Sequence, residues 1–182
     1  SSPQLLAHLS RRTMARRMTA GELVRIWPGV YSLGAPDAQR RLRGLDLQCG
    51  ERVVLCLGTA AQAYGFDTED VTDLHVLHPL DRRLRDDDGL VVHRREGAPL
   101  TSLHGRPITA PGWTAVEVAR ALRRPRALAT PDAALRSGTC TPRDLVLAAK
   151  SQAGRRGIVV VLELLPLARP QSESPMESEA RL

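Results

Sequence analysis

The sequence of 182 residues is poor in aromatic side chains, with two Trp, two Tyr and one Phe. A surface that stacks unpaired bases needs interleaved aromatic residues, so this composition argues against a single-strand or RNA-binding platform. Cysteine is also scarce: the three residues stand at wide spacing with no C-x-x-C pair, which argues against a disulfide framework or a zinc site. We therefore expect Cys49, Cys56 and Cys140 to be free thiols in a reducing compartment.

Long apolar runs are absent too. No stretch approaches the roughly 20 apolar residues that span a bilayer, and no signal peptide is recognisable. We therefore expect a cytoplasmic protein without a membrane partner. The sequence also lacks a Walker loop, a G-x-S-x-G elbow, an H-E-x-x-H pair and any Cys/His pairing. It thus predicts no catalytic residue, no metal site and no cofactor, and it gives no support to an enzyme within these residues.

Positive charge is concentrated at one end. Residues 1–43 hold eight arginines and two acidic residues, a balance of +6 that equals the net charge of the whole chain. The remaining residues therefore sum to zero. A localised excess of this kind indicates an anionic partner, and the alternative is a merely solvated face. The eight residues are Arg11, Arg12, Arg16, Arg17, Arg25, Arg40, Arg41 and Arg43.

The first four of these arginines belong to a predicted helix. Ser10 is a good N-cap, and Gly21 stands where a helix would end. At about 100° per residue, Arg12 and Arg16 fall on one face of that helix. One side can therefore pack while the other meets phosphate.

A hairpin should follow, because L-V-R-I-W and V-Y-S-L flank Pro28-Gly29. Pro-Gly suits a type II turn, which is less favoured in two-residue hairpins and so indicates a longer loop. A short helix over residues 3–9 would precede the basic helix. This order is typical of a winged helix-turn-helix over residues 1–34 whose first helix is missing.

The pattern over residues 35–170 predicts a small domain of mixed helices and strands. The expected fold class is therefore α+β, with the winged helix-turn-helix at the N-terminus of this domain. We expect helices over residues 37–48 and 59–64, a buried strand over 52–57, further strands over 73–78 and 89–95, and a hairpin over 100–109. Helices are then expected over residues 113–122, 131–136 with Thr130 as cap, 142–149 with Thr141 as cap, and 157–165. The S-x-x-E box at Ser174 predicts one more helix near the end.

Several segments together resemble a known family. L-S-R-R-T-M-A-R-R-M-T-A-G-E-L-V-R-I-W-P-G-V-Y-S-L, L-G-T-A-A-Q-A-Y-G-F, D-L-H-V-L-H-P, G-R-P-I-T-A-P-G-W-T-A-V-E-V-A, P-D-A-A-L-R-S-G and E-S-P-M-E-S-E-A-R-L are similar to actinobacterial AbiEi-like antitoxins. The resemblance covers nearly the whole chain. It implies a winged-helix DNA-binding domain joined to an antitoxin-type α+β domain. It departs at Leu57-Gly58-Thr59-Ala60-Ala61, where members show a polar S-H-x-S-A-A segment, so no role is assigned there.

In many proteins of this kind, a very-short-patch-repair-like endonuclease domain follows. The resemblance implies that such a domain would begin within residues 171–182. Only Glu173, Glu177 and Glu179 could then belong to its site, whereas a two-metal site needs several converging carboxylates. The residues given should not cut DNA.

We therefore expect a double-stranded DNA-binding protein of the antitoxin or autoregulator kind. Arg12, Arg16 and Thr13 would face the major groove, and Arg11, Arg17 and Arg25 would contact phosphates. A cognate toxin and a homodimer are further expected partners, although no heptad supports the latter. Two alternatives stay open: the DNA-targeting part of a nuclease whose catalytic domain follows Leu182, and a protein-interaction module.

Three weaker motifs have plain structural interpretations. His75 and His78 lie three apart on a predicted strand and should point to opposite faces, which argues against a shared metal. The acidic run Asp86-Asp87-Asp88 is expected to be a solvated turn. The segment 154–157, G-R-R-G, suits a loop between helices and, as an alternative, a phosphate contact.

Overall fold

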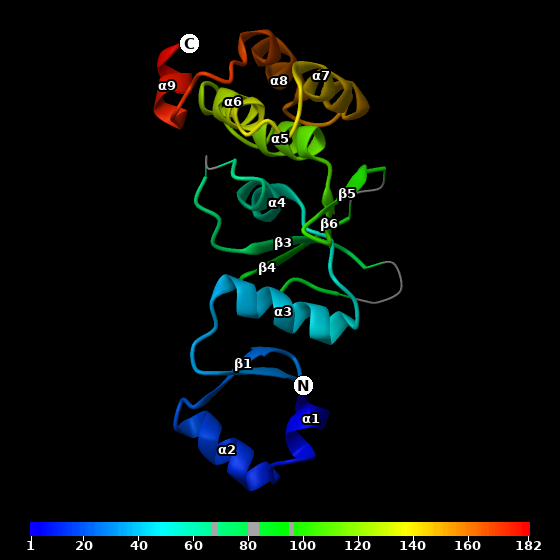
Figure 1. Cartoon of the computed structure of the whole chain (residues 1–182), viewed down its shortest axis with the longest axis vertical. Coiled ribbons are helices and arrows are strands. Elements are labelled where there is room, and N and C mark those ends of the chain that lie inside the picture. The colour runs from blue at the N-terminus through cyan, green and yellow to red at the C-terminus, as the bar shows by residue number, and fades with distance from the viewer. Residues whose placement is uncertain (67–68, 80–83, 95–96) are drawn as a thin grey trace.

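A computed structural model describes residues 1–66, 69–79, 84–94 and 97–182 of the chain. The molecule is elongated, with three parts stacked along its long axis (Figure 1). Two short helices and a hairpin lie at the N-terminal end, strands lie in the middle, and a layer of helices lies at the C-terminal end. Within the described residues, no helix combines the length and apolar character needed to cross a membrane.

The N-terminal part contains α1 (Ser2–Leu6), α2 (Arg11–Thr19), β1 (Leu23–Trp27) and β2 (Val30–Leu33). Helix α1 is shorter than expected because the chain turns early to reach Ser10, whose hydroxyl accepts the backbone N–H of Thr13 at 3.1 Å and starts α2. The backbone N–H of Ser2 donates to the Gly29 carbonyl at 2.7 Å. This bond fixes the start of the chain to the turn of the hairpin.

Strands β1 and β2 pair antiparallel, as the alternating pattern predicted. The expected longer loop is wrong: only Pro28 and Gly29 join the strands, and Gly29 has a φ of +76°. The register shifts between Arg25 and Trp27. We attribute this bulge to the turn, because a type II turn twists against the strands and a bulge restores their twist.

Helix α3 (Ala38–Cys49) covers this hairpin. The side chain of Asp37 caps it by accepting the N–H of Arg40 at 2.7 Å. A Cβ on Gly44 would lie 3.2 Å from Val30 and 3.3 Å from Trp27, so the missing side chain permits the close approach. The indole N–H of Trp27 donates to the Arg41 carbonyl at 2.7 Å. Trp27 is 1% exposed and thus joins the hairpin to α3.

The central strands form two pairs. Strand β3 (Leu74–Leu77) runs parallel to β4 (Leu90–His93), and β5 (Leu100–Leu103) runs antiparallel to β6 (Arg106–Thr109). The β4 region was expected to extend to residue 95, which lies outside the described residues.

The expected strand over residues 52–57 is wrong as an element. Leu55 instead makes single bridges to Val76 and Ile108, and so links the two strand pairs. The strand cannot continue because Leu57, at a φ of +46°, already begins α4 (Leu57–Ala63).

The helical layer contains α5 (Pro111–Ala119), η1 (Arg126–Leu128), α6 (Ala129–Arg136), α7 (Pro142–Ser151), α8 (Ile158–Leu164), η2 (Leu165–Leu167) and α9 (Pro175–Ala180). Helix α5 is central, because every residue from Gly112 to Ala119 is buried. The cap of α7 at Thr141 and the helical state of α8 are confirmed. Thr130 is not a cap: η1 runs directly into α6, which places Thr130 inside the helix and buries it.

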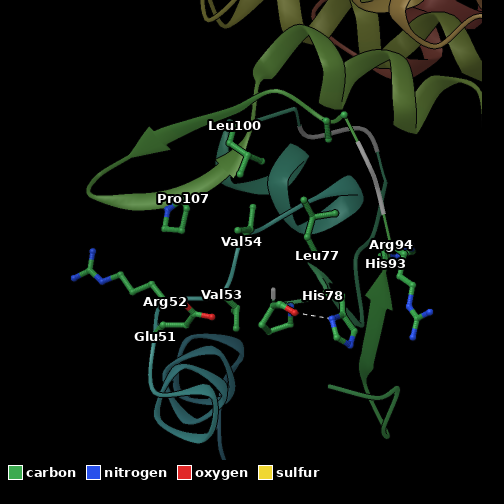
Figure 2. A pocket seen from close by; sticks show the side chains of 13 residues that line it. Glu51, Arg52, Val53, Val54, Leu77, His78, His93, Arg94, Leu100 and Pro107 are labelled. Carbon is green, nitrogen blue, oxygen red and sulfur yellow. Dashed lines mark hydrogen bonds between the residues drawn. The ribbon is translucent and has the colours of Figure 1, made fainter. Parts of the chain in front are cut away.

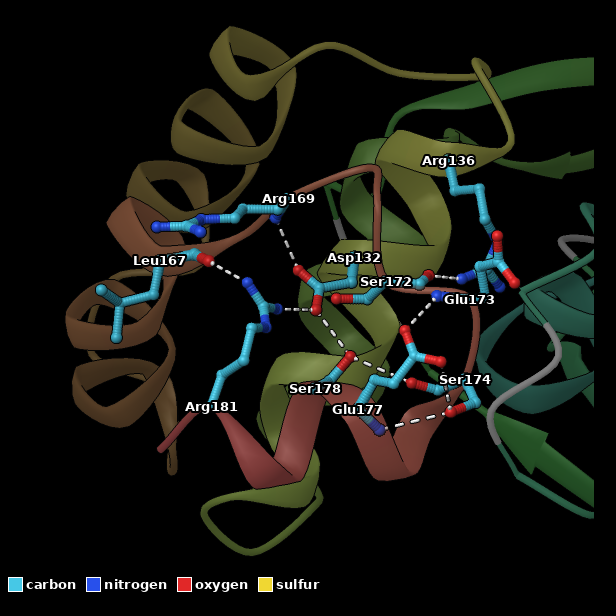
Figure 3. Close-up of polar contacts among 10 residues, drawn as sticks. All are labelled: Asp132, Arg136, Leu167, Arg169, Ser172, Glu173, Ser174, Glu177, Ser178 and Arg181. Carbon is cyan, nitrogen blue, oxygen red and sulfur yellow. Dashed lines mark hydrogen bonds and ion pairs between the residues drawn. The ribbon is translucent and has the colours of Figure 1, made fainter.

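The C-terminal segment is fastened to this layer by Asp132 of α6 (Figure 3). The Asp132 carboxylate is 1% exposed and accepts the backbone N–H of Arg169 and the hydroxyl of Ser178, each at 2.6 Å. The Arg181 guanidinium pairs with the same carboxylate. Ser174 caps α9 by accepting the N–H of Glu177 at 3.2 Å, as the sequence predicted. Helix α9 therefore packs as part of the layer.

Candidate nucleic-acid interface

Helix α2 presents its arginines to solvent. None of its residues is buried, and Arg11, Arg12 and Arg16 are exposed. Among the described residues, none of these three side chains has a hydrogen bond or an ion pair. Guanidinium groups of this kind keep all five donors available for phosphate or base edges. All three arginines therefore stand on one exposed helix, which lies at the N-terminal end of the molecule (Figure 1).

Two of the predicted contact residues are already engaged. The Thr13 hydroxyl lies 2.9 Å from the Ser10 hydroxyl at the start of α2, so it belongs to the helix cap. The Arg17 Nε lies 3.8 Å from a carboxylate oxygen of Glu22. This acidic neighbour neutralises part of the positive charge at that end of the helix. Thr13 and Arg17 are consequently less available than the other predicted residues.

Arg25 comes from the hairpin. It lies on β1 opposite Tyr31 and is exposed, whereas Leu23 and Trp27 on the same strand are buried. The two apolar residues anchor the strand against the helices, and Arg25 remains at the surface. Basic side chains from two elements, α2 and β1, are thus held on one small folded unit.

The remaining arginines of the basic end serve the fold in part. Arg41 stacks over the Trp27 ring at 4.9 Å from its centroid and donates to the Asp88 carbonyl. Arg40 lies 4.0 Å from Asp37 at the start of α3. The Arg41 contacts join α3 to the hairpin and to Asp88, and the Arg40 pair lies at the start of α3 itself. Arg43 of α3 is exposed and, like Arg11, Arg12 and Arg16, has no hydrogen bond or ion pair within the described residues.

The histidines of the central strands pair in a way the sequence did not reveal. His75 Nδ1 lies 2.9 Å from His93 Nε2, and the two rings stack with centroids 5.1 Å apart. Burial lowers the pKa of His75, and the charge of Asp73 offsets part of that effect. The pair follows from the parallel register of β3 and β4, which brings β4 residues beside β3 residues. Spacing along the chain could not show this.

His78 is separate from that pair. Its Nδ1 lies 2.7 Å from the carbonyl of Pro79, as Figure 2 shows. It lines a hollow of about 610 Å³ together with His93, Arg52, Leu77 and Leu100. No group of three or more His, Cys, Asp or Glu residues suited to a metal occurs in the described parts of the chain.

The other motifs have structural roles. Asp86 accepts the N–H of Val92 at 2.7 Å, and Asp87 accepts that of Asp88 at 2.9 Å, so the acidic run shapes a turn. In the loop between α7 and α8, the Arg155 guanidinium stacks on Trp113 at 4.9 Å. These contacts favour the plain interpretation of both segments.

Two carboxylates of the C-terminal segment, those of Glu177 and Glu179, are also engaged. Glu177 accepts the N–H of Glu173 at 2.9 Å, and Glu179 pairs with Arg126 at 2.9 Å. Glu177 therefore stabilises the start of α9, and Glu179 joins α9 to Arg126 of η1. Burial raises the pKa of the Cys140 thiol to about 11, and the charge of Asp144 adds to the effect. All three cysteines are buried, and none of them forms a disulfide within the described residues. A thiol of that kind is a poor nucleophile.

Comparison with known proteins places the chain in a family. Two uncharacterized proteins of Mycobacterium tuberculosis, from strains CDC 1551/Oshkosh and ATCC 25618/H37Rv, are each 53% identical to it over 174 residues, which is 96% of this chain and 64% of the relative. The chain thus spans less than two thirds of the length of these relatives. The family model of the AbiEi antitoxin C-terminal domain matches residues 53–167, which include the central strands and most of the helical layer. The chain therefore belongs to the AbiEi antitoxin family.

Proposed function

We propose that this chain is a double-stranded DNA-binding antitoxin that regulates transcription from its own operator. The observation that carries the proposal is the set of exposed guanidinium groups on α2 and β1, at Arg11, Arg12, Arg16 and Arg25. Family membership supports the antitoxin part of the proposal. Residues 1–34 act as the winged helix-turn-helix unit, and residues 35–170 act as the antitoxin-type domain.

In this proposal, α2 lies in the major groove. Arg12 and Arg16 are one turn apart and read base edges, since a guanidinium fork matches the two acceptors of guanine. Arg11 and Arg25 contact the phosphates on either side, which sets the position of the helix without reading sequence. Thr13 supports the cap rather than a base contact, and Arg17 contributes less because of Glu22.

The antitoxin-type domain would engage a cognate toxin or its target, and a homodimer would read two half-sites. Ion pairs within this domain support that division, because several of its arginines are paired with acids, as Arg106 is with Asp46 and Arg126 with Glu69. Such pairs neutralise the positive charge of those arginines, whereas Arg11, Arg12 and Arg16 of α2 have no acidic partner in the described residues. Binding of DNA is therefore assigned to the N-terminal unit.

The test is selection of bound duplexes from a random pool, followed by titration of the best duplex at several salt concentrations. Arg12→Ala combined with Arg16→Ala should weaken binding by at least tenfold. Arg11→Ala and Arg25→Ala each take one guanidinium away from the phosphates, so each should lower the magnitude of the salt slope by about 0.9. The matched control is Arg123→Ala combined with Arg143→Ala, which removes the same charge from exposed positions of the helical layer.

The control variant should bind duplex within about twofold of the natural sequence. Equal weakening by the two double variants would show that only net charge matters and would contradict the assignment to α2. Absence of duplex binding below micromolar protein at moderate salt would favour the alternative of a protein-interaction module.

A further inference from the structure

A second basic site lies away from α2, in a hollow of about 460 Å³. It lies between α3, the segment 52–57 that links the two strand pairs through Leu55, and the β5–β6 hairpin. Three arginines line it, and they come from separate elements: Arg43 from α3, Arg52 from the loop after it, and Arg106 from β6. Among the described residues, no acidic side chain lines this hollow. The arginines are 63 positions apart at most along the chain, from 43 to 106, so only the fold brings them together.

The charges of the three arginines are balanced to different degrees. Arg106 forms a two-pronged pair with Asp46, and each side chain is 18% exposed. Arg43 has no hydrogen bond or ion pair within the described residues. Arg52 donates one N–H to the Gly105 carbonyl at 2.6 Å and pairs with no carboxylate in that part of the chain. Two positive charges at the hollow are therefore uncompensated.

The position of Arg52 is fixed by an unusual turn. His104 and Gly105 join β5 to β6 with φ values of +50° and +73°, so both central residues of the two-residue turn are left-handed. Asn, Asp or Gly is the usual choice at the first of these positions, yet His104 stands there and lines the hollow. The turn directs the Gly105 carbonyl to Arg52 and so holds its guanidinium at the rim.

The floor of the hollow is apolar. Leu55 and Ile108 are buried, and Leu103 is half-buried beside them. A concave site with an apolar floor and a few convergent cationic groups is the form typical of small-ligand pockets. Helix α2, by contrast, is an exposed helix with no buried residue. The two basic regions thus differ in shape as well as in location.

We infer that this hollow binds a small phosphorylated organic molecule, such as a nucleoside monophosphate. The Arg43 and Arg52 guanidinium groups hold the phosphate, for which their planar forks are suited. The apolar part of the ligand lies against the half-buried Leu103, and the buried Leu55 and Ile108 close the hollow beneath it. The inference goes beyond the proposed function, because none of these residues belongs to the helix and hairpin assigned to DNA.

Nuclear magnetic resonance titrations of the full chain test this inference, with inorganic phosphate, adenosine and AMP as separate probes. The arginine Nε–H resonances of Arg43 and Arg52 should shift with phosphate and with AMP. AMP should saturate at a concentration at least tenfold below that of phosphate, because its base and sugar add contact with the floor. Adenosine should bind at least tenfold more weakly than AMP.

The variant Arg43→Gln combined with Arg52→Gln should raise the Kd for AMP by at least tenfold. Arg123→Gln combined with Arg143→Gln is the control for removal of two charges and should change that Kd by less than twofold. Thermal unfolding of both variants checks that they fold. Arg52→Lys tests the fork: a partial loss of AMP binding is expected, since the charge stays but the planar arrangement of donors on two nitrogens is lost.

Absence of shifts at Arg43 and Arg52 with millimolar phosphate and AMP would overturn the inference. Shifts there with a duplex but with neither small probe would overturn it too, because the hollow would then be a backbone contact. The proposed function fails separately: its test depends on Arg12 and Arg16, whose double variant should still bind AMP. Loss of duplex binding without loss of AMP binding thus tells the two apart.

Discussion

The N-terminal unit and the helical layer use arginine in opposite ways. On α2, Arg11, Arg12 and Arg16 are exposed and have no acidic partner in the described residues. In the helical layer, Arg126 pairs with Glu69 and Glu179, and Arg181 pairs with the buried Asp132. The N-terminal unit thus leaves three arginines of one helix without a carboxylate partner in the described residues, whereas the helical layer pairs several of its arginines with carboxylates of the same chain.

This difference teaches more than the count of basic residues does. A chain of net charge +6 with a sequence pI near 10.2 could have bound anions anywhere on its surface. Pairing decides where that charge is available, because an ion pair neutralises the local field. The comparison therefore predicts that stability changes and DNA-binding changes will separate between the two regions.

The largest expected effect is on the core of each region. Trp27→Ala removes the side chain that joins the hairpin to α3, and Trp113→Ala removes a buried ring of α5; the exposed fractions are 1% and 3%. Each should lower the free energy of unfolding by about 3 to 5 kcal/mol. Below the unfolding temperature of both variants, only Trp27→Ala should also weaken duplex binding. Gel shift measures duplex binding of both variants. Equal weakening of that binding would contradict the assignment of DNA binding to the N-terminal unit alone.

A smaller effect is expected at the Asp132 cluster. Arg181→Ala leaves the buried carboxylate with two neutral donors and should cost about 1.5 to 3 kcal/mol in urea unfolding, the range for hydrogen bonds to charged groups. Arg169→Ala is the matched control, because Arg169 contacts Asp132 through its backbone N–H, which the substitution keeps. Both variants should bind duplex as the natural sequence does. Equal stability of the two would mean that the Arg181 pair contributes nothing.

Local signals in the sequence were sufficient for much of the fold. The caps at Ser10, Thr141 and Ser174 are confirmed, since each depends on residues within three positions of one another. The antiparallel pairing of the two hairpins is confirmed for the same reason. Short-range hydrogen bonds and the alternation of apolar and polar residues can therefore be predicted from the sequence without knowledge of the fold.

Contacts between residues far apart in the chain could not be predicted in this way. Residues 52–57 are apolar enough for a strand, but the chain turns at Leu57, so the segment only bridges two strand pairs through Leu55. The His75–His93 pair depends on a parallel register, and the hollow lined by Arg43, Arg52 and Arg106 depends on three separate elements. For the candidate DNA interface, the sequence named the arginines but not the partners that make Thr13 and Arg17 less available.

The arginines of α2 also differ among themselves, because Arg17 has an acidic neighbour in Glu22 and Arg11 has none in the described residues. Arg11→Ala should reduce the magnitude of the salt slope of duplex binding by about 0.9, because it removes one phosphate contact. Arg17→Ala should reduce it by less, because Glu22 holds that side chain. Glu22→Gln should raise duplex affinity, and in that background Arg17→Ala should have the full effect. A double-mutant cycle over Arg17 and Glu22 measures the coupling, and additive effects would contradict it.

The smallest expected effect is the pH dependence contributed by the central strands. The folded-state pKa of His75 is lowered from its usual 6.5, mainly by burial. Above about pH 6.5 the imidazole is neutral in both the folded and the unfolded chain, so its contribution to stability is constant. Below that pH the unfolded chain takes up a proton that the folded chain resists, and stability falls until the pH reaches the folded pKa.

The His75→Asn variant should therefore lose less stability than the natural sequence between pH 6.5 and the acid limit of folding. Urea unfolding at a series of pH values measures this difference. His93 Nε2 lies 2.9 Å from His75 Nδ1, so the stability of His93→Asn at neutral pH separately measures what that contact contributes to folding. His78→Asn is the control, since its ring bonds to the neighbouring Pro79 carbonyl and stands outside the pair. A pH profile unchanged by His75→Asn would contradict the lowering of the His75 pKa by burial.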